Sequence, residues 1–384
     1  MNFTGEMNLC VSSKLLPNMI RHKNPTKKSS VLYKLFALAI ILSFIGLIFI
    51  FESSSVRSFN EYSNSFHYLK MQSIWLVLGM VTLIFFSFFD YHKLYYLAFS
   101  FMMVTIILLV FVLIPGIGNK VGGARRWFDL GFFNIQPTEL AKFSVILYLS
   151  SWLVHKERKR FFAFVAFIGI LMFLILLQPD MGTAIIVFSL SVFIYFLAGI
   201  ELWYLAIFLP FSFFIFYFLI KLSPYRFNRL LAFFDPARDP LGITYHINQI
   251  LISLANGGIL GRGLGASRQK YLFLPEAHTD SIFAIVGEEF GFFGGLLTIL
   301  TFMVFFYYLF RISQSASDRF GRLLAGGIFV FFNLQVIINL AAIVNLIPLT
   351  GVPLPFLSYG GSNLLVSFSL LGIATNIARQ SRTI

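Results

Sequence analysis

The chain has 384 residues, of which 58% are hydrophobic and only 12% are charged. A soluble domain of this composition would expose too much apolar surface, so the sequence predicts a membrane protein. The formal net charge of +13 comes mainly from Lys and Arg in short loops between apolar runs, which is typical of cytoplasmic loops and excludes nucleic acid as the partner. The apolar runs do not alternate with polar residues, which excludes a transmembrane β-barrel.

Ten apolar segments approach the length of about 20 residues that crosses a bilayer. The fourth is the weakest because it carries Glu139 and Lys142, so we expect it to face other helices. The expected fold is all-α: a polytopic membrane protein with about ten transmembrane helices. The segments lie near Val31–Phe51, Ser73–Phe89, Leu94–Ile114, Pro137–Val154, Phe161–Leu177, Met181–Ile200, Leu202–Leu222, Ser281–Phe310, Leu323–Ile347 and Ser362–Ala378.

The loop charges predict the orientation, because Lys and Arg stay on the cytoplasmic side. They gather before the first span, after the fourth and eighth, and at the C-terminus, which places both termini in the cytoplasm. We therefore expect a flexible cytoplasmic tail (1–30), a transmembrane domain (31–378) and a short cytoplasmic tail (379–384). The long loop 223–280, between the seventh and eighth spans, then lies outside the membrane.

That outer loop is basic, and a glycine-rich stretch runs through it from Gly257 to Gly265. Glycines allow a backbone to approach a ligand closely, and their N–H groups can hold phosphate. With Arg262, Arg268 and Lys270 beside it, the stretch is a candidate pyrophosphate site. A flexible, solvated turn explains the glycines equally simply, and both interpretations stay open.

Asp280 is the best candidate for a general base, because it lies where the eighth span begins. A helix N-terminus stabilises a carboxylate as an anion. The alternative is that Thr279 or Asp280 only caps the helix, and the local sequence favours that cap. His278 is more simply a packing or hydrogen-bonding residue, and no His/Cys cluster has the spacing of a zinc site.

Glu139, Lys142, Glu288 and Glu289 are charged residues within predicted spans, where each needs a partner or water. Glu288 and Glu289 are adjacent in the eighth span, and Lys142, one turn from Glu139 in the fourth, is a possible partner for them. A buried ion-pair network that locks the bundle is the favoured interpretation. The alternative is the lining of a polar cavity or a proton path.

Two further segments are candidates for contact with a lipid substrate. Arg125-Arg126-Trp127 joins cations to an aromatic ring, which indicates either interfacial anchoring or contact with a lipid-linked phosphate. The Pro/Gly-rich segment Pro348–Gly361 follows the ninth span. Irregular backbone at membrane depth is tolerated only against protein or a cavity, so we expect it to re-enter the bilayer and wall a groove.

These motifs together resemble the SEDS family of membrane proteins, of the FtsW/RodA type. The resemblance covers nearly all of the chain after the N-terminal tail. It rests on Arg126-Trp127, Gln136–Lys142, Gln178–Thr183, Asp235-Pro236, Gly242, Tyr245-His246, Gln249, Gly261–Lys270, Leu274–Asp280, Glu288–Gly291, Pro353–Pro355 and Ser358–Ser362.

The resemblance implies a peptidoglycan glycosyltransferase that polymerises lipid II at the outer face of the bacterial cytoplasmic membrane, in cell division or elongation. It implies lipid II and a polyprenyl-pyrophosphate-linked glycan as substrates, a class B penicillin-binding protein as partner, and Asp280 as the catalytic carboxylate. Gln269-Lys270 and the following Pro-Glu-Ala-His-Thr-Asp favour an FtsW-like protein of the division septum. Ser281 departs from the family pattern, in which Phe is usual, and we expect activity to survive this change.

The candidate site has one catalytic residue, Asp280. We expect a divalent cation, Mg or Mn, as the one candidate cofactor, and no protein metal site. A lipid II flippase and a non-catalytic scaffold for the penicillin-binding protein are the alternative functions. The candidate substrate-binding residues are Arg126, Lys142, Arg262, Arg268, Lys270 and His278, and the structural or cavity-lining residues are Glu139, Asp180, Glu288, Glu289 and Ser358.

Overall fold

The computed structural model describes residues 25–121, 124–129, 131, 133–155, 160–199 and 202–381. Within these residues the chain forms twelve helices and a small antiparallel sheet of three strands in the order β1-β2-β3. The elements are α1 (Pro25–Tyr62), α2 (His67–Phe88), α3 (Tyr91–Phe111), β1 (Asn119–Val121), β2 (Ala124–Asp129), β3 (Asn134–Ile135), α4 (Pro137–Trp152), α5 (Phe161–Leu177), α6 (Met181–Leu197), α7 (Leu202–Lys221), α8 (Pro224–Phe234), α9 (Tyr245–Gly257), α10 (Ile282–Ser315), α11 (Arg319–Ile343) and α12 (Gly361–Gln380).

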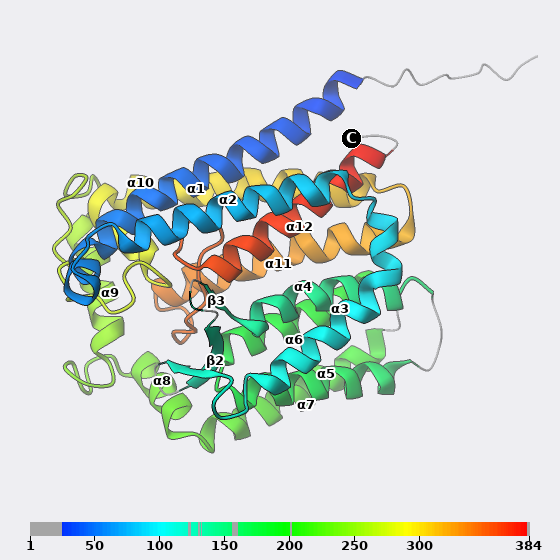
Figure 1. The fold of residues 1–384 in the computed structure, drawn as a ribbon. Coiled ribbons are helices and arrows are strands. Elements are labelled where there is room, and N and C mark those ends of the chain that lie inside the picture. The colour runs from blue at the N-terminus through cyan, green and yellow to red at the C-terminus, as the bar shows by residue number, and fades with distance from the viewer. Residues whose placement is uncertain are drawn as a thin grey trace, which may run out of the picture.

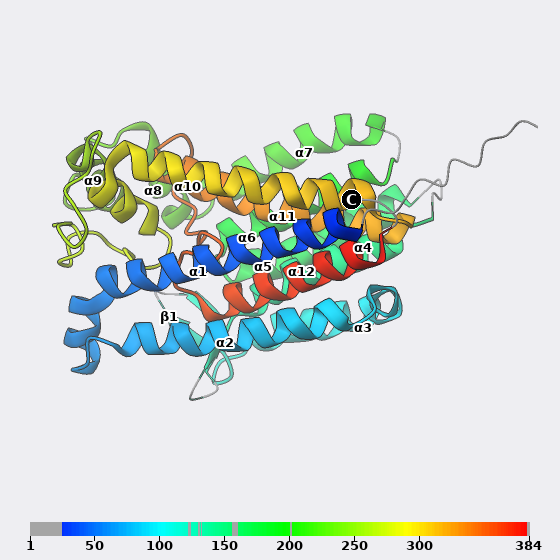
Figure 2. The same cartoon turned by 90° about the horizontal axis from the view of Figure 1, so that it is seen from above.

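Helices α1 to α7 and α10 to α12 run roughly parallel or antiparallel to one another, lengthwise through the bundle (Figure 1). The short helices α8 and α9 and the strands gather at one end, which we call the loop end. Helix α1 begins and α12 ends at the opposite end, as both views show (Figure 2). The ten predicted spans therefore correspond one for one to helices, and the predicted all-α membrane fold is confirmed.

Seven helices of the described chain are long and apolar enough to cross a membrane. The other three lengthwise helices are shorter, with 17 residues in α5 and in α6 and 16 in α4. The three strands, and helices α8 and α9 within the loop 223–280, were not predicted from the sequence. Helix α1 begins at Pro25, inside the expected tail. Residues 1–24, 156–159 and 382–384, which carry other expected tail and loop segments, lie outside the described residues.

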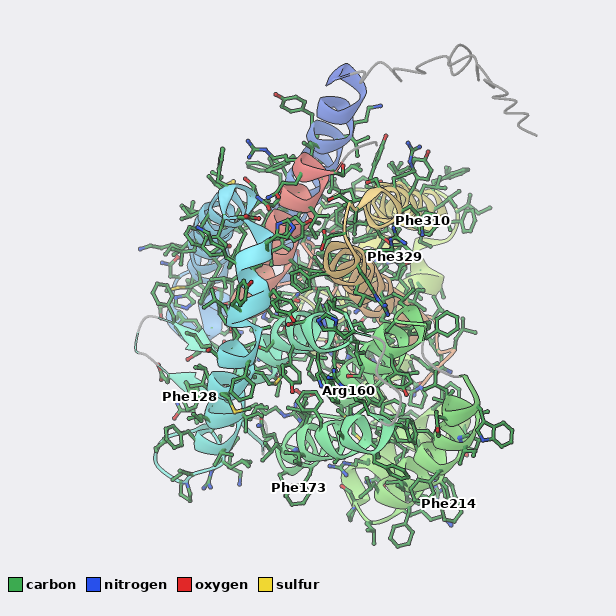
Figure 3. The ribbon with its side chains drawn as sticks, turned by 90° about the vertical axis from the view of Figure 1, so that its right-hand side faces the viewer. Phe128, Arg160, Phe173, Phe214, Phe310 and Phe329 are labelled. Carbon is green, nitrogen blue, oxygen red and sulfur yellow. The ribbon has the colours of Figure 1, made fainter. Side chains whose placement is uncertain are left out.

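Burial differs sharply between the helices, and this places the core. Helices α11 and α12 are the most enclosed of the seven candidate spans, because 72% and 89% of the residues in their apolar stretches are buried. Helix α7 is only 11% buried. Aromatic rings such as Phe173 and Phe214 lie on the periphery (Figure 3) and are 63% and 69% exposed. In a membrane protein such a periphery faces lipid, so the 50 Phe residues serve both the core and this surface.

Helix α10 is broken near its start, and the glycine-rich stretch packs against the break. Gly291 has φ 63° and ψ −157°, which interrupts the helix. The amides of Arg262 and Gly263 donate to the carbonyls of Glu288 and Glu289, at 3.0 and 2.9 Å. A Cβ on Gly261 would lie 2.2 Å from the carbonyl oxygen of Glu289. The glycines therefore let two backbones touch, and the stretch is a packed joint instead of a flexible turn.

The second irregular segment, 344–360, folds back into the bundle as expected. Leu354, Phe356 and Ser358 are at most 1% exposed. Its polar backbone groups are satisfied by side chains from several helices, which apolar surroundings require. Gln335 Nε2 donates to the carbonyl of Pro353 at 3.0 Å, and the Ser358 hydroxyl accepts from the amide of Leu354 at 2.8 Å.

The joint between the glycine-rich stretch and α10 gives a stability prediction. We expect Gly291→Ala to lower the free energy of unfolding by at least about 1–3 kcal/mol, the cost of forcing a side chain into a conformation that favours glycine. A Cβ there would also lie 2.4 Å from the amide nitrogen of Gly261. Thermal unfolding of the purified protein in detergent measures the effect. Gly169→Ala in α5 is the matched control, because a Cβ there meets nothing within 4 Å; equal melting temperatures for both variants would contradict the packed joint.

Candidate active site

Asp280 lies at the loop end, one residue before the N-cap of α10. The N-cap is Ser281, and no side chain caps the helix, so the interpretation of Thr279 or Asp280 as a cap is wrong. Asn339 of α11 holds the Asp280 backbone, because its Nδ2 donates to the Asp280 carbonyl at 2.8 Å and to the Val352 carbonyl at 2.7 Å. The carboxylate is thus positioned by the backbone, and its oxygens are not used in the helix start.

The Asp280 carboxylate has few and long contacts of its own. Its Oδ1 accepts from the hydroxyls of Thr279 and Ser281 at 3.4 and 3.5 Å. Its Oδ2 faces Gly351: a Cβ added there would lie 3.7 Å from this oxygen and 4.0 Å from Arg229 Nη1. The missing side chain at Gly351 therefore leaves room beside the carboxylate and a neighbouring guanidinium.

Burial raises the pKa of the Asp280 carboxyl above its usual value, and the nearby His246 and Arg229 offset part of this rise. This direction differs from the expectation that a helix N-terminus would hold the group as an anion. A carboxylate with a raised pKa is the stronger base, provided that it is ionised at working pH. The site thus favours proton acceptance more than the sequence alone indicated.

Two residues near Asp280 were missed as functional candidates. His246 of α9 bonds through Nε2 to the Ser281 hydroxyl at 2.9 Å, and Arg229 of α8 donates to the Leu349 carbonyl at 2.9 Å. Both line a small hollow together with Asn345. His246 lay within a quoted motif but had no assigned role, and nothing in the local sequence around Arg229 indicates that α8 would bring it there.

His278 lies on the other side of this turn, away from the hollow. Its ring is 3% exposed and packs at 4.7 Å from the ring of Tyr68 and at 5.5 Å from that of Tyr359. Its carbonyl accepts the amide of Tyr359 at 2.9 Å. Burial lowers the pKa of His278 to about 4, so it is neutral at pH 7. These contacts fit the packing interpretation, and substrate binding by His278 stays an untested prediction.

The expected pyrophosphate site is not formed by the glycine-rich amides, because those of Gly261, Arg262 and Gly263 donate within the chain. The Arg262 guanidinium is exposed and bonds to the Asn256 side chain at 2.9 Å. Arg268 is exposed, while its amide donates to Glu288 at 3.2 Å. The two arginines therefore remain exposed on this loop, where an anion could meet them.

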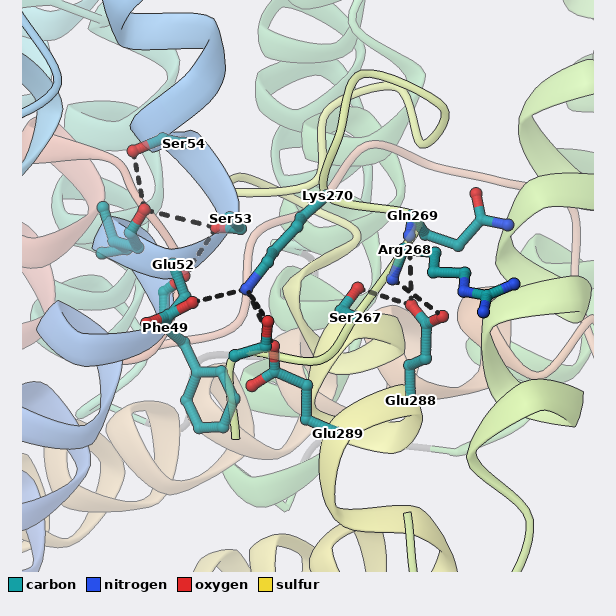
Figure 4. A network of polar contacts seen from close by, with 12 residues as sticks. Phe49, Glu52, Ser53, Ser54, Ser267, Arg268, Gln269, Lys270, Glu288 and Glu289 are labelled. Atoms are coloured by element: carbon teal, nitrogen blue, oxygen red, sulfur yellow. Dashed lines mark hydrogen bonds and ion pairs between the residues drawn. The ribbon is translucent and has the colours of Figure 1, made fainter. Parts of the chain in front are cut away.

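Lys270 has a different environment from the two arginines (Figure 4). It is 7% exposed, and its Nζ contacts Glu52 of α1 at 2.6 Å, the Gly265 carbonyl at 2.7 Å and Glu289 of α10 at 3.5 Å. Its partners keep the pKa of Lys270 above the usual value although burial alone would lower it. We call Lys270, Glu52 and Glu289 the lysine latch, which fastens the loop to two helices.

Glu288 and Glu289 do not pair with Lys142, so that part of the predicted network is wrong. Glu288 accepts from the Ser267 hydroxyl at 2.5 Å and from two loop amides (Figure 4). Lys142 pairs instead with Glu139 at 2.7 Å, and both are nearly fully buried. The four charges thus form separate local clusters, which agrees with a structural role, and Lys142 bonds within α4 and not to the loop 223–280.

The other candidate residues fasten elements together at the loop end. Asp180 caps α6 by accepting the amide of Thr183 at 3.1 Å. Arg126 on β2 donates to the carbonyls of Gln178 and Pro179 in the turn before α6. The Ser358 hydroxyl accepts from Leu354 within its own segment, and the Ser358 carbonyl accepts from Gln72 of α2 at 3.3 Å. The Arg126 guanidinium is thereby hydrogen-bonded to the protein backbone. Its predicted contact with a lipid-linked phosphate stays a prediction.

No three His, Cys, Asp or Glu side chains of the described chain gather closely enough to hold a metal ion. Asp280 has a histidine and an arginine as its charged neighbours of opposite sign, which is a poor donor set for Mg²⁺ or Mn²⁺. The described residues around Asp280 therefore do not form a cation site by themselves.

Comparison with known proteins agrees with this architecture. A family model of the FtsW/RodA/SpoVE type, described as a cell cycle protein, matches residues 33–383. The chain belongs to the FtsW/RodA/SpoVE family. It is 38% identical over 355 residues to the probable peptidoglycan glycosyltransferase FtsW of Trichlorobacter lovleyi, covering 90% of this chain and 92% of that protein.

Two further relatives extend the likeness. The stage V sporulation protein E of Bacillus subtilis is 37% identical over 374 residues, covering 93% of this chain and 99% of that protein. A chain from a structure titled as the structural coordination of polymerization and crosslinking by a peptidoglycan synthase complex superposes with a TM-score of 0.73. That chain is 28% identical, with coverage of 90% of this chain and 97% of its own. The predicted family is thus confirmed, and the names of its relatives agree with the predicted enzyme class.

The lysine latch gives a prediction that separates stability from substrate binding. We expect Lys270→Met to lower the free energy of unfolding by about 3–5 kcal/mol, because it strands the buried Glu289 carboxylate without its cation. Thermal unfolding in detergent measures this loss. Arg268→Met is the matched control, because its side chain is exposed and is expected to leave the melting temperature unchanged. A Lys270→Met variant of normal stability with weaker substrate binding would instead support a phosphate contact.

Proposed function

We propose that this chain is an inverting peptidoglycan glycosyltransferase that polymerises lipid II, with Asp280 as its general base. The observation that carries the proposal is the position of Asp280: a partly buried carboxylate of raised pKa, anchored by its backbone and open toward Gly351. The names of the curated relatives and the synthase complex supply the reaction class.

In the proposed reaction the growing glycan is the donor, joined by an α bond from its terminal MurNAc to polyprenyl pyrophosphate. The 4-hydroxyl of GlcNAc on an incoming lipid II attacks C1 of that MurNAc. A β-glycosidic bond forms as the bond to pyrophosphate breaks, and Asp280 accepts the hydroxyl proton. Positioned base catalysis of this kind contributes about 10²–10⁴-fold, and holding both sugars in line supplies much of the remaining rate.

The leaving pyrophosphate gathers negative charge, which cations near the site would stabilise. Arg262 and Arg268 are exposed on the loop and suit this role, whereas Lys270 is already held in the latch. Arg229 lies beside Asp280 and is the nearest cation to the proposed base. A divalent cation on the pyrophosphate remains a prediction, brought by the substrate and not by a protein site.

The protein is a multi-pass membrane protein, and we infer that its loop end faces outward from the bacterial cytoplasmic membrane. The basic loops predict cytoplasmic termini, and the start of α1 and the end of α12 lie together at the end opposite the loop end. This orientation gives Asp280 access to lipid-borne sugars at the outer surface. An FtsW-like role at the division septum is the favoured setting, with an elongation role as the alternative.

A class B penicillin-binding protein is the proposed partner, within the division or elongation machinery. The support is the structural likeness to a chain of a complex that coordinates polymerization and crosslinking. A purely scaffolding role for this chain would leave the environment of Asp280 without a purpose, because a scaffold needs helix surfaces and no base.

The lipid II flippase is less well supported than the polymerase. A flippase needs a polar path through the membrane, for which Glu139, Lys142, Glu288 and Glu289 were the candidates. Glu139 and Lys142 form an ion pair with each other, while Glu288 and Glu289 are bound by residues of the loop end. Each of the four charges is thus satisfied by a local partner instead of lining a path across the membrane. This favours an outer site at Asp280.

The decisive variant is Asp280→Asn, which keeps the shape but cannot accept the proton. We expect it to insert and unfold like the unchanged protein, to bind lipid II, and to make no glycan strand. The measurement is polymer length from labelled lipid II, with purified protein tested alone and with its penicillin-binding partner. Asp129→Asn, an exposed carboxylate of β2, is the matched control and should polymerise normally. Long strands from Asp280→Asn would remove the proposed base.

A further inference from the structure

The Ser281 hydroxyl lies between the proposed base and an imidazole. It is 2.9 Å from His246 Nε2 and 3.5 Å from Asp280 Oδ1. Ser281 is fully buried, so bulk water does not compete for its hydroxyl. Three groups that can pass a proton are therefore aligned on a side of Asp280 that the proposed reaction does not use.

His246 is placed to receive a proton from this hydroxyl. A hydrogen bond to the backbone of Pro275 favours its protonated form, and the negative charges of Asp280 and Glu276 act in the same direction. Burial, the largest effect, and the positive Arg229 of α8 oppose them, so the pKa of His246 lies below its usual value. With its hydrogen on Nδ1, toward the backbone, Nε2 is free to accept from Ser281. A group that is neutral but readily charged is suited to transient proton transfer.

The imidazole also has a route to solvent. His246 is only partly buried, and it lines the small hollow that Arg229 and Asn345 share. Asp280, by contrast, is enclosed further by substrate when two sugars occupy the site. A base that has accepted a proton must release it before the next sugar is added. When substrate fills the site, no water lies beside Asp280 to take that proton.

Resting on the function proposed above, we propose that Ser281 and His246 form a proton relay that regenerates the Asp280 carboxylate after each glycosyl transfer. Protonated Asp280 gives its proton to the Ser281 oxygen, while the Ser281 hydroxyl gives its own proton to His246 Nε2. The imidazolium then releases a proton to water in the hollow. Asp280 ends as a carboxylate, Ser281 as a hydroxyl and His246 as a neutral ring, so one proton leaves and no other bond changes. Both are positioning residues that act through Asp280.

The test compares Ser281→Ala, His246→Gln and the double variant in steady-state polymerisation of labelled lipid II. We expect each single variant to lose about tenfold in kcat, a part of the 10²–10⁴-fold that a positioned base supplies, with KM for lipid II unchanged. The double variant should be no slower than either single one, because both break the same chain. Added imidazole buffer should restore kcat in the variants but not raise it in the unchanged protein.

Two controls separate the relay from damage to the fold. Ser281→Thr keeps the hydroxyl and should retain kcat. Thr279→Ala removes a hydroxyl that is equally close to Asp280 but whose other bonds go to Glu276, and it should show no dependence on buffer concentration. His246→Gln also removes a group that lowers the pKa of Asp280, so the acid limb of its kcat profile should move to higher pH.

The proposal is overturned if Ser281→Ala keeps the unchanged kcat, or if the losses of the two single variants multiply in the double variant, or if added buffer restores neither. If the unchanged protein makes no polymer, the proposed function itself fails. The relay is then judged by an NMR titration of the His246 imidazole. That titration must shift in Ser281→Ala, which removes the hydroxyl bonded to Nε2, and stay in place in Thr279→Ala, and equal curves overturn the relay.

Discussion

Two non-helical segments, 258–281 at the loop end and 344–360 folded into the bundle, meet at Asp280, and the polar backbone that they bury there must be satisfied; the rest of the structure depends on this constraint. Side chains from the helices supply the missing partners. Asn339 is the central one, because a single amide nitrogen donates to the carbonyls of Asp280 and Val352 and so joins the two segments. The proposed base is fixed where these segments meet, on backbone that cannot move without losing buried hydrogen bonds.

The charged residues of the bundle serve the same purpose. Glu288 accepts from loop amides, and Lys270 spans from the loop to α1 and α10. Buried ion pairs contribute little net stability, but breaking one is costly, so they enforce one arrangement. These contacts hold the loop against the first turns of α10. The loop end is therefore a rigid frame for Asp280, and its remaining exposed cations, such as Arg268, are free to meet an anionic substrate.

The sequence was a good guide to the helices and a poor one to the contacts. A helix needs about 20 mostly apolar residues to cross a bilayer, so apolar runs near this length made all ten spans predictable from the sequence. Helix α8 was missed because its apolar and polar residues mix within a loop. Lys270 was assigned to phosphate because its partner Glu52 lies 218 positions away. Asp280 was found by its place and by resemblance, whereas its link to His246 depends on how α9 packs.

The central claim is that the Asp280 carboxylate faces the attacking hydroxyl of a lipid-borne sugar. An experimental structure of the protein with a bound, non-reactive lipid II analogue tests it most directly. The account predicts the GlcNAc 4-hydroxyl within about 2.6–3.2 Å of an Asp280 carboxylate oxygen, the reach of a general base. A sugar bound instead among Glu139, Lys142 and the helices around them, with Asp280 facing only protein, would contradict it.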